Sequence, residues 1–375
     1  MFLPFATSSS RRRALLAALV PLLGLTLLVG GTVSASGSTI PASPERLATA
    51  AGANPLLSAP WPIYTGHAEG AYAAWKNATG DTKTQLAKIA LQPRVIWFTD
   101  GSQPRGAADL VRQRISDFQN GDPNTYAQLA VFGLYPQGED HRTAPFTDAM
   151  QATYKAWINN VAAGIGDSKV IMILEPDLGV AYSGWRPSVR FALAAYASRV
   201  FRQLPNVVIY LDASDGDWLP ATQAISMLVR SGIRNVRGFA LGATHYASAA
   251  SNILYGQRLV RMLAARGYGT KHFVIDTADN GRPFTWLQFY AAHPHGSFDN
   301  ANVCQTRTQV RCDTLGIPPT PDTANPRWGM SATVRAAAAR YCDAFLWYGR
   351  PWLDNQANPF DLSRALAVAR TTPWQ

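Results

Sequence analysis

The stretch Val170-Ile-Met-Ile-Leu-Glu-Pro-Asp177 begins with an unbroken run of large apolar residues and ends in two acidic ones, Glu175 and Asp177. A short run of this kind, with no polar residue to face water, is typical of a strand that is buried on both faces. Parallel strands of α/β proteins are buried in this way, because helices cover both sides of the sheet. The stretch therefore predicts a parallel strand that carries carboxylates at its carboxyl end.

The same pattern recurs along the chain. Apolar runs that we expect to form strands occupy residues 94–98, 128–134, 170–174, 207–211, 236–241, 273–275 and 344–348. Acidic residues lie at or after the ends of most of these runs: Asp100, Glu139 with Asp140, Glu175 with Asp177, Asp212, Asp276 and Asp354. The fifth run is followed instead by His245 and Tyr246. In an α/β barrel the carboxyl ends of all strands open onto one face, so these side chains are expected to converge there.

Amphipathic stretches separate the runs and predict helices. They occupy residues 107–118, 146–163, 187–202, 221–229, 248–265, 331–339 and 360–369. Strands that alternate with helices indicate a parallel sheet, and the polar strand ends favour a closed or nearly closed barrel over an open doubly wound sheet. No glycine-rich dinucleotide-binding pattern follows any of the runs, which also argues against the open sheet.

The first residues have the composition of a secretory signal. Arg11, Arg12 and Arg13 precede an apolar run over residues 14–28, and small residues follow at 33–36. The apolar run is shorter than the roughly 20 residues that a membrane-spanning helix needs, which favours a cleaved signal over an uncleaved anchor. We expect a signal peptide at residues 1–36, a flexible lead-in at 37–53, a catalytic domain at 54–375 and a secreted protein with no stable membrane association. The general secretory and twin-arginine routes both fit.

The formal net charge is +10, but the basic residues are spread along the chain. Nucleic-acid-binding domains concentrate their charge in a basic patch or helix, so we expect no nucleic-acid partner. No histidine or cysteine lies in a metal-binding motif. We therefore expect neither a metal nor another cofactor, and we expect a monomer.

The three cysteines, Cys304, Cys312 and Cys342, allow one disulfide and one remaining thiol in a secreted protein. Three pairings are open. We favour Cys304 with Cys312, because these two flank a short polar segment that reads as a stapled loop.

A family resemblance rests on several segments in a fixed order. After Trp97-Phe98 and the 170–179 segment come Tyr210-Leu-Asp-Ala213 with Trp218, His272-Phe-Val-Ile-Asp-Thr277 with Asn280-Gly281, Leu315-Gly-Ile-Pro-Pro-Thr320 and Asp343-Ala-Phe-Leu-Trp347. In this order they resemble glycoside hydrolase family 6, the β-1,4-glucan hydrolases that comprise endoglucanases and cellobiohydrolases. The resemblance runs from about residue 54 to residue 354. It implies a distorted seven-stranded β/α barrel, similar to a TIM barrel, with a cleft or tunnel over the carboxyl ends of its strands. It also implies hydrolysis with inversion at the anomeric carbon.

The resemblance assigns roles to carboxylates. Asp177 matches the general acid of the family, and Asp212 matches the aspartate that lies near this acid. Asp354 is the candidate base, although its alignment needs a one-residue gap and Asn355 replaces the usual glycine. The family has a further aspartate after the second strand, and alignment on Pro136 places Glu139 there, with Asp140 as the alternative.

Other positions depart from the family pattern. Asp215 stands where a histidine is frequent, Gly242 where an asparagine is usual, and Val303 where a tryptophan commonly precedes the cysteine. These departures concern the substrate subsites more than the chemistry.

Inverting hydrolysis needs a protonated carboxyl and an ionised one about 6.5 to 9.5 Å apart, a separation that distant strand ends can supply. A negative charge near Asp177, from Glu139 or Asp212, would raise the pKa of the acid. Glu175 is expected to be a structural hydrogen-bonding partner. Asp276 is expected either to order the end of its strand or to contact the sugar.

Sugars also need aromatic platforms for their apolar faces. The candidates at or after strand ends are Trp97, Trp218, Tyr246, Trp347 and Trp352. The sequence thus predicts a secreted β-1,4-glucanase whose partner is a β-glucan polysaccharide or oligosaccharide. The alternatives are a catalytically weakened glycan-binding protein on the same scaffold and a hydrolase of another β-glucan.

Overall fold

The computed structural model describes residues 53–99, 101, 103–135 and 141–374. Its central sheet has seven strands in the order β1-β2-β3-β4-β5-β6-β7, so each strand lies beside its neighbours in sequence. All the pairings are parallel. The strands are β1 (Ile96–Phe98), β2 (Ala127–Val131), β3 (Val170–Leu174), β4 (Val207–Asp212), β5 (Gly238–Leu241), β6 (His272–Asp276) and β7 (Cys342–Leu346). The predicted strands are confirmed, with ends shifted by up to three residues.

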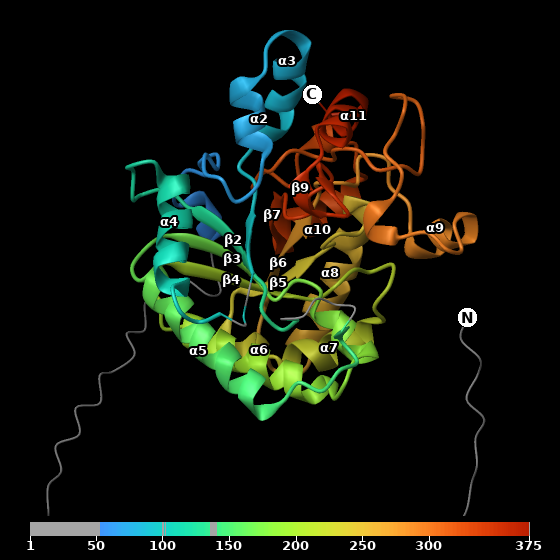
Figure 1. Cartoon of the computed structure of the whole chain (residues 1–375). Helices are drawn as coiled ribbons and strands as arrows, with labels where there is room; N and C mark the ends of the chain where they lie inside the picture. The colour runs from blue at the N-terminus through green and yellow to red at the C-terminus, as the bar shows by residue number, and fades with distance from the viewer. Residues whose placement is uncertain (1–52, 100, 102, 136–140, 375) are drawn as a thin grey trace, which may run out of the picture. The chain divides into compact units, whose positions relative to one another are not determined.

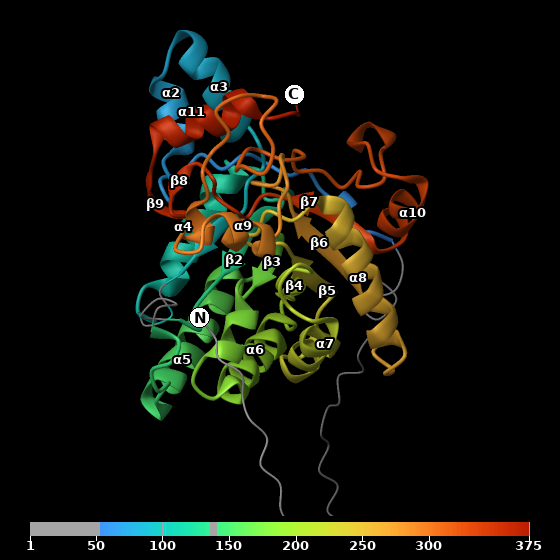
Figure 2. The same cartoon turned by 90° about the vertical axis from the view of Figure 1, so that its right-hand side faces the viewer.

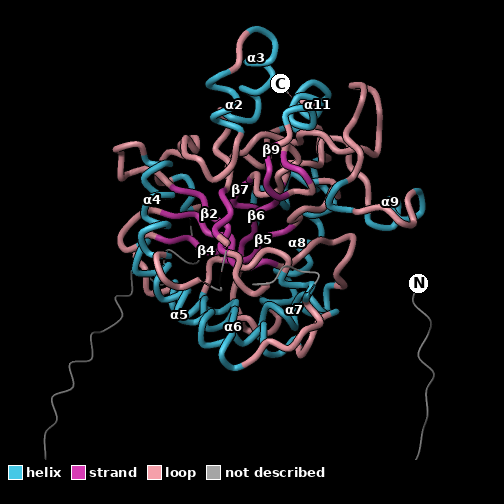
Figure 3. The backbone as a smooth tube through the Cα atoms, viewed as in Figure 1, coloured by secondary structure: helices cyan, strands magenta, loops and turns pink. Residues whose placement is uncertain are grey.

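Helices follow the strands and pack on the outside of the sheet (Figures 1 and 2). The predicted helices all form: α4 (Ala107–Gln119), α5 (Asp148–Ile165), α6 (Pro187–Phe201), α7 (Ala221–Arg230), α8 (Ala249–Ala264), α10 (Ala332–Tyr341) and α11 (Leu362–Thr371). The sequence reasoning missed α2 (Ala71–Asn77), α3 (Gly80–Ala90) and α9 (Trp286–Ala292). Figure 3 shows how the helices and loops surround the strands.

The two edge strands of the sheet approach each other. The backbone N–H of Val95, just before β1, donates to the carbonyl oxygen of Trp347, just after β7, at 2.8 Å. The indole Nε1 of Trp97 donates to the carbonyl oxygen of Tyr348 at 2.7 Å. The sheet therefore curls until its first and last strands meet, which is the distorted barrel that the sequence predicts.

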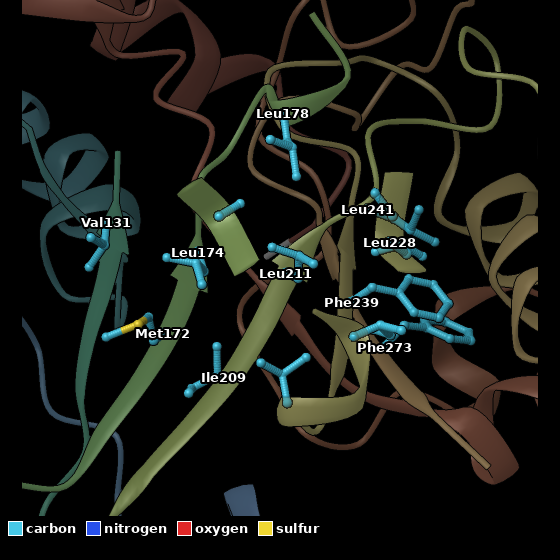
Figure 4. Close-up of a cluster of buried hydrophobic side chains, with 14 of the residues drawn as sticks. Val131, Met172, Leu174, Leu178, Ile209, Leu211, Leu228, Phe239, Leu241 and Phe273 are labelled. Carbon is cyan, nitrogen blue, oxygen red and sulfur yellow. The ribbon is translucent and has the colours of Figure 1, made fainter. Parts of the chain in front are cut away.

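Alternation along β3 explains why its apolar run is unbroken. Val170, Met172 and Leu174 pack in the core between sheet and helices, whereas Ile171 and Ile173 pack inside the barrel. Figure 4 shows the outer row, with Met172 and Leu174 beside the matching residues of the neighbouring strands. Because both faces are buried, no position within the strand can hold a polar side chain, and polar groups appear only where the strand ends.

Short elements occupy the chain between β6 and α10. They are α9, η5 (Phe298–Asn300) and η6 (Pro326–Trp328). Within it Cys304 and Cys312 form a disulfide, which is the favoured pairing, and Cys342 is a buried free thiol. The remaining short elements are η1 (Pro55–Leu57), η3 (Leu178–Ser183), η4 (Ile233–Asn235) and a hairpin of β8 (Leu353–Asp354) with β9 (Ala357–Phe360).

The expected signal peptide and the start of the lead-in lie outside the described residues. In the part of the chain that the structure describes, we find no helix with the length and apolar character needed to span a bilayer.

A buried ion pair ties the start of the barrel to its end. The Arg94 guanidinium is fully buried and bonds Glu69 Oε1 at 2.5 Å and the carbonyl oxygens of Ile89 and Ala90 at 2.7 Å. Glu69 Oε2 accepts a hydrogen bond from Trp352 Nε1 at 2.5 Å. The segment before β1, the end of α3 and the segment after β7 thus share one buried charge pair.

A second buried carboxylate joins the ends of β2 and β3. Glu175 accepts hydrogen bonds from the N–H groups of Gly133 and Leu134, both at 3.1 Å, and from the Tyr154 hydroxyl at 2.7 Å. Burial raises the pKa of Glu175 to about 7, although these hydrogen bonds act in the opposite direction. Glu175 is therefore a structural partner, as its sequence context suggests.

We predict that Glu69→Gln destabilises the fold by about 3 kcal/mol, because it leaves the Arg94 guanidinium buried without a counter-charge. Urea denaturation measures the effect. The matched control is Asp81→Asn, which breaks the exposed pair between Asp81 and Arg370 and should leave the unfolding free energy unchanged within error. Equal stability of Glu69→Gln and the wild type would contradict the prediction.

We also predict that Glu175 makes stability depend on pH. Its folded-state pKa, about 7, lies above the ordinary value of 4.5. Its contribution is therefore complete below about pH 4.5 and is lost as the pH rises through about 7, by an amount on the order of 1 to 3 kcal/mol. Glu175→Gln cannot ionise, so its unfolding free energy should fall less steeply between pH 5 and pH 8. Parallel pH profiles for the two proteins would rule this out.

Candidate active site

The turn after β3 places Asp177 at the mouth of the barrel. Both Glu175 (φ 52°) and Asp177 (φ 62°) adopt left-handed backbone conformations, and η3 begins directly after them. Such conformations cost non-glycine residues on the order of 1 to 3 kcal/mol each and are concentrated at functional sites. The turn directs the two acidic side chains differently, because Glu175 is fully buried while Asp177 remains partly exposed.

Asp212, at the end of β4, holds this turn in place. Its Oδ2 accepts hydrogen bonds from the backbone N–H of Leu178 at 3.1 Å and of Ser214 at 3.0 Å. Its Oδ1 is buried and receives no hydrogen bond from any described residue. Burial raises the pKa of Asp212 to about 7, against the two N–H donors and the charge of His245. Near neutral pH this carboxyl is thus close to the midpoint of its titration.

Gly179 allows the turn to pack against the loop after β4. A Cβ atom at this position would lie 2.1 Å from Ser214 Oγ and 3.1 Å from the Trp218 ring. Any larger residue would push η3 away from the Asp212 loop. The close approach brings Asp177, Asp212 and Trp218 into one part of the barrel mouth.

Asp276, at the end of β6, is a structural carboxylate. It is fully buried and accepts hydrogen bonds from the N–H groups of Ala278 at 3.0 Å, Tyr348 at 3.3 Å and Gly349. Burial raises its pKa to about 7, and these hydrogen bonds oppose the rise. The carboxylate is enclosed by backbone N–H groups of the segments after β6 and β7, which fits the first of the two roles expected for Asp276, the ordering of its strand end. Its contact with a sugar stays a prediction.

Arg350 is a site residue that the sequence reasoning missed. Its guanidinium lies over the Trp97 ring, 4.0 Å from the ring centroid, and its Nε is buried with no acceptor among the described residues. Burial lowers the pKa of Arg350 to about 10. This effect is opposed by the negative charges around it, which belong to Asp177, Glu69, Asp276 and Asp299. The only sequence signal is its place, three residues after Trp347, in the segment that leads to Asp354.

Asp354 is exposed on the hairpin β8–β9. Gln356 joins this hairpin to the mouth of the barrel. Its Oε1 accepts a hydrogen bond from the backbone N–H of Arg350 at 2.6 Å, and its Nε2 donates to Asp279 Oδ2 at 2.8 Å. The segment that carries Asp354 therefore starts at an arginine that interacts with Asp177. The other acidic candidates, Glu139, Asp140 and Asp100, lie outside the described residues.

The expected aromatic platforms divide into two groups. Trp97 and Trp218 are partly exposed. Tyr246 (0% exposed), Trp347 (2%) and Trp352 (1%) are buried. Other residues cover these three rings: Tyr246 stacks on Phe284 at 4.5 Å, and the indole N–H groups of Trp347 and Trp352 bond Ile317 O and Glu69. Their role as sugar platforms stays a prediction that these contacts do not favour.

Asp215, Asp217 and His245 form a group that could hold a metal ion, with one ligand atom from each within 4.8 Å of the others. Their oxygens already have protein donors. Asp215 accepts from the Asp217 N–H at 2.9 Å and from Asn252 at 2.8 Å, and Asp217 bonds His245 Nδ1 at 2.9 Å.

Burial opposes the charge of His245, but the hydrogen bond to Asp217 and the charges of Asp215, Asp217 and Asp299 outweigh it and raise the pKa of His245. This arrangement favours a protonated imidazole as the cation of the group. The histidine that the family often has after β4 is replaced by Asp215, and a histidine stands instead after β5.

The mouth thus combines a partly exposed aspartate on a strained turn, a buried aspartate that holds the turn, an arginine and two open indoles. Such a set can transfer a proton to a ligand with apolar faces and hydroxyl edges.

Comparisons with known proteins identify the family of the chain. The model of the family described as "Glycosyl hydrolases family 6" matches residues 59–338. Endoglucanase 1 of Streptomyces halstedii is 31% identical over 214 residues, which cover 56% of this chain and 65% of that protein. Endoglucanase A of Cellulomonas fimi is 31% identical over 218 residues, which cover 56% of this chain and 44% of that protein. The chain thus spans between about half and two thirds of the length of these relatives.

A solved structure supports the same assignment. The endoglucanase Cel6 of Mycobacterium tuberculosis, in complex with methyl-cellobiosyl-4-deoxy-4-thio-β-D-cellobioside, superposes with a TM-score of 0.66 at 25% identity. The superposition covers 85% of this chain and 99% of that one. With the match of the family model, the ordered sequence segments and the barrel, the chain belongs to glycosyl hydrolase family 6.

Proposed function

We propose that residues 54–375 form a catalytic domain that hydrolyses β-1,4-glucosidic bonds of cellulose-like polysaccharides with inversion. The protein acts outside the cell after a signal peptide at residues 1–36 is removed. The observation that carries the proposal is the strained turn that holds Asp177 at the mouth while Asp212 bonds the next backbone N–H. The printed names of the relatives, endoglucanases and cellobiohydrolases, support the β-1,4-glucan as substrate.

In the proposed reaction Asp177 is the general acid. Its proton goes to the glycosidic oxygen as the bond from this oxygen to the anomeric carbon breaks. A water molecule attacks the anomeric carbon from the opposite face, and Asp354 accepts the proton that the water loses. One displacement inverts the anomeric configuration. The reaction needs no cofactor, because the two carboxyl groups supply and accept the proton.

The neighbouring charges have opposite effects on the acid. An ionised Asp212 raises the pKa of a carboxyl beside it and so favours the protonated form that the reaction needs. Arg350 interacts with Asp177 and favours the ionised form, which is the state left after proton transfer. Asp212 and Arg350 thus act in opposite directions on the protonation of Asp177. In the proposal Glu139 is a further negative group that favours the protonated form.

Trp97 and Trp218 are the proposed sugar platforms, since both indoles are partly exposed. The Arg350 guanidinium covers part of the Trp97 ring and so leaves the rest of that indole for a sugar. The substrate is then bound by indole faces and by a few polar groups at the edges of the rings.

We predict that Asp177→Asn lowers kcat on carboxymethyl-cellulose and cello-oligosaccharides by about 100-fold to 10,000-fold with little change in KM, because it removes the donated proton. Asp109→Asn, on the outer helix α4, is the control and should keep wild-type rates. NMR of the first product should show the α-anomer. A glycan-binding protein without catalysis would instead bind these chains without turnover, and Asp177→Asn would change nothing.

We predict that Asp354→Asn lowers kcat by about 100-fold or more, and that azide, a small anionic nucleophile that needs no base, partly restores turnover. Asp299→Asn is the comparison, because Asp299 is another partly exposed carboxylate near Arg350. If Asp354→Asn were silent and Asp299→Asn lost activity with azide rescue, the role of the base would pass to Asp299.

A further inference from the structure

The hairpin of β8 and β9, which carries Asp354, turns through two residues with left-handed backbone conformations. Asp354 pairs with Ala357, and the two residues between them, Asn355 (φ 48°) and Gln356 (φ 55°), form the turn. Two-residue turns of this kind need a positive φ at both positions and usually hold Asn followed by Gly. A glutamine at the second position keeps this conformation only where its surroundings hold it there.

The side chain of Gln356 is buried, in contrast to those of its neighbours. Gln356 is 2% exposed, whereas Asp354 and Asn355 are exposed. Its Oε1 accepts a hydrogen bond from the backbone N–H of Arg350 at 2.6 Å, and its Nε2 donates to Asp279 Oδ2 at 2.8 Å. The amide therefore bonds the segment before β8 with its oxygen and the loop after β6 with its nitrogen.

The two partners of Gln356 belong to one tightly packed part of the barrel mouth. Asp279 is fully buried, and a Cβ atom at Gly349 would lie 2.7 Å from its Oδ2 and 2.8 Å from Asp276 Oδ2. The chain just before Arg350 thus packs directly on both carboxyl groups, and the N–H of Gly349 bonds Asp276. Gln356 accepts the next N–H along the chain, which fixes the turn against this segment.

The same segment interacts with the proposed acid. The Arg350 guanidinium lies over the Trp97 ring and interacts electrostatically with Asp177. Gln356 therefore connects the turn beside Asp354, the proposed base, to the backbone of a residue that acts on the acid.

The charges around Asp279 explain why an amide suits this position. Burial and the charges of Asp276 and Asp313 raise the pKa of Asp279, and the hydrogen bond from Gln356 opposes the rise. A neutral amide donates this bond without adding charge to the buried group of carboxyls. The change Gln356→Glu would remove the donor and add one more acidic group.

From these contacts we propose that Gln356 is the positioning residue of the catalytic base, because it holds the turn beside Asp354 against the barrel. The inference deepens the proposed function and rests on its assignment of Asp354 as the base. An exposed carboxylate on a short hairpin moves with the hairpin, and a misplacement of about 1 Å can lower the rate of a reaction about 100-fold. A merely structural Gln356 would support the fold without acting through Asp354.

The first test removes the contact with Asp279 and then rebuilds it with donor and acceptor exchanged. Gln356→Met keeps the length of the side chain without its hydrogen bonds, and we expect kcat on cellohexaose to fall about 10-fold to 100-fold, with KM changed at most about twofold. Gln356→Glu should lose as much. Asp279→Asn should restore most of the kcat lost in Gln356→Glu, because an asparagine amide can donate where the aspartate accepts.

The second test asks whether Gln356 acts through Asp354. In the Asp354→Asn background, Gln356→Met should lower kcat at most about twofold further, because the group that it positions is gone. Azide should partly restore turnover in Gln356→Met, as it does in Asp354→Asn. Gln113→Met is the matched control: it removes an exposed amide donor to Asp117, also at 2.8 Å, and should keep wild-type rates.

Hydrogen exchange followed by mass spectrometry separates this inference from the proposed function. Faster exchange at residues 350–360 in Gln356→Met, with β3 unchanged, would uphold the anchoring of the hairpin even if the wild type hydrolysed no β-glucan and the hydrolase proposal failed. Wild-type kcat and exchange in Gln356→Met would overturn the inference.

Two further outcomes would overturn it while the hydrolase proposal stood. One is a loss in Gln356→Met that multiplies with the loss in Asp354→Asn. The other is a loss that azide relieves in Asp354→Asn but not in Gln356→Met. If Asp354→Asn were silent, the assignment of the base would fail, and the role of Gln356 in the reaction would fail with it. Thermal melting of each variant establishes that it is folded.

Discussion

The burial of β3 on both faces is the constraint on which the rest of the structure depends. Its side chains alternate between the outer core and the barrel interior, and both environments are apolar. The chain therefore places its first carboxylates where the strand ends, and there it turns through two left-handed residues. The turn buries the Glu175 carboxylate and leaves Asp177, the proposed acid, partly exposed. The site thus follows from the packing of the strand beneath it.

Below the partly exposed aspartate lies a set of buried charges that balance one another. Asp212, Asp215 and Asp276 have pKa values raised to about 7, 6 and 7 by burial, and backbone or side-chain donors limit each rise. His245, whose pKa the neighbouring carboxylates raise, and Arg350 lie near these groups. Carboxyl groups that interact in this way titrate as a set, so their pKa values belong to the group and not to one residue. For proton-transfer chemistry at near-neutral pH this is a favourable setting.

Much of the fold could be predicted from the sequence, because apolar periodicity reports local burial. The strands are unbroken apolar runs and the outer helices have regular periodic patterns, and the predictions for them hold. Helix α9 has only seven residues, too few for a period to be recognised. The burial of Tyr246 and Trp347 depends on loops that are distant in sequence, since Phe284 and Ile317 cover them. Arg350 was missed for the same reason, because its contact with the Trp97 ring is tertiary and leaves no local pattern in the sequence.

The contacts that join the segment before β1 to the segment after β7 determine when the barrel can close. Helix α11 lies beside α3, where Lys88 Nζ donates to the carbonyl oxygen of Ala369 at 3.0 Å, and the buried Arg94 reaches the segment of Trp352 through Glu69 (Figure 1). The ring between β1 and β7 thus closes only when residues 347 and 348 are present to accept the hydrogen bonds of Val95 and Trp97. During synthesis at about 5 to 20 residues per second, the first strand therefore waits for its partner across the ring while all the other strands are made. Ring closure is in this sense a late step in the assembly of the barrel.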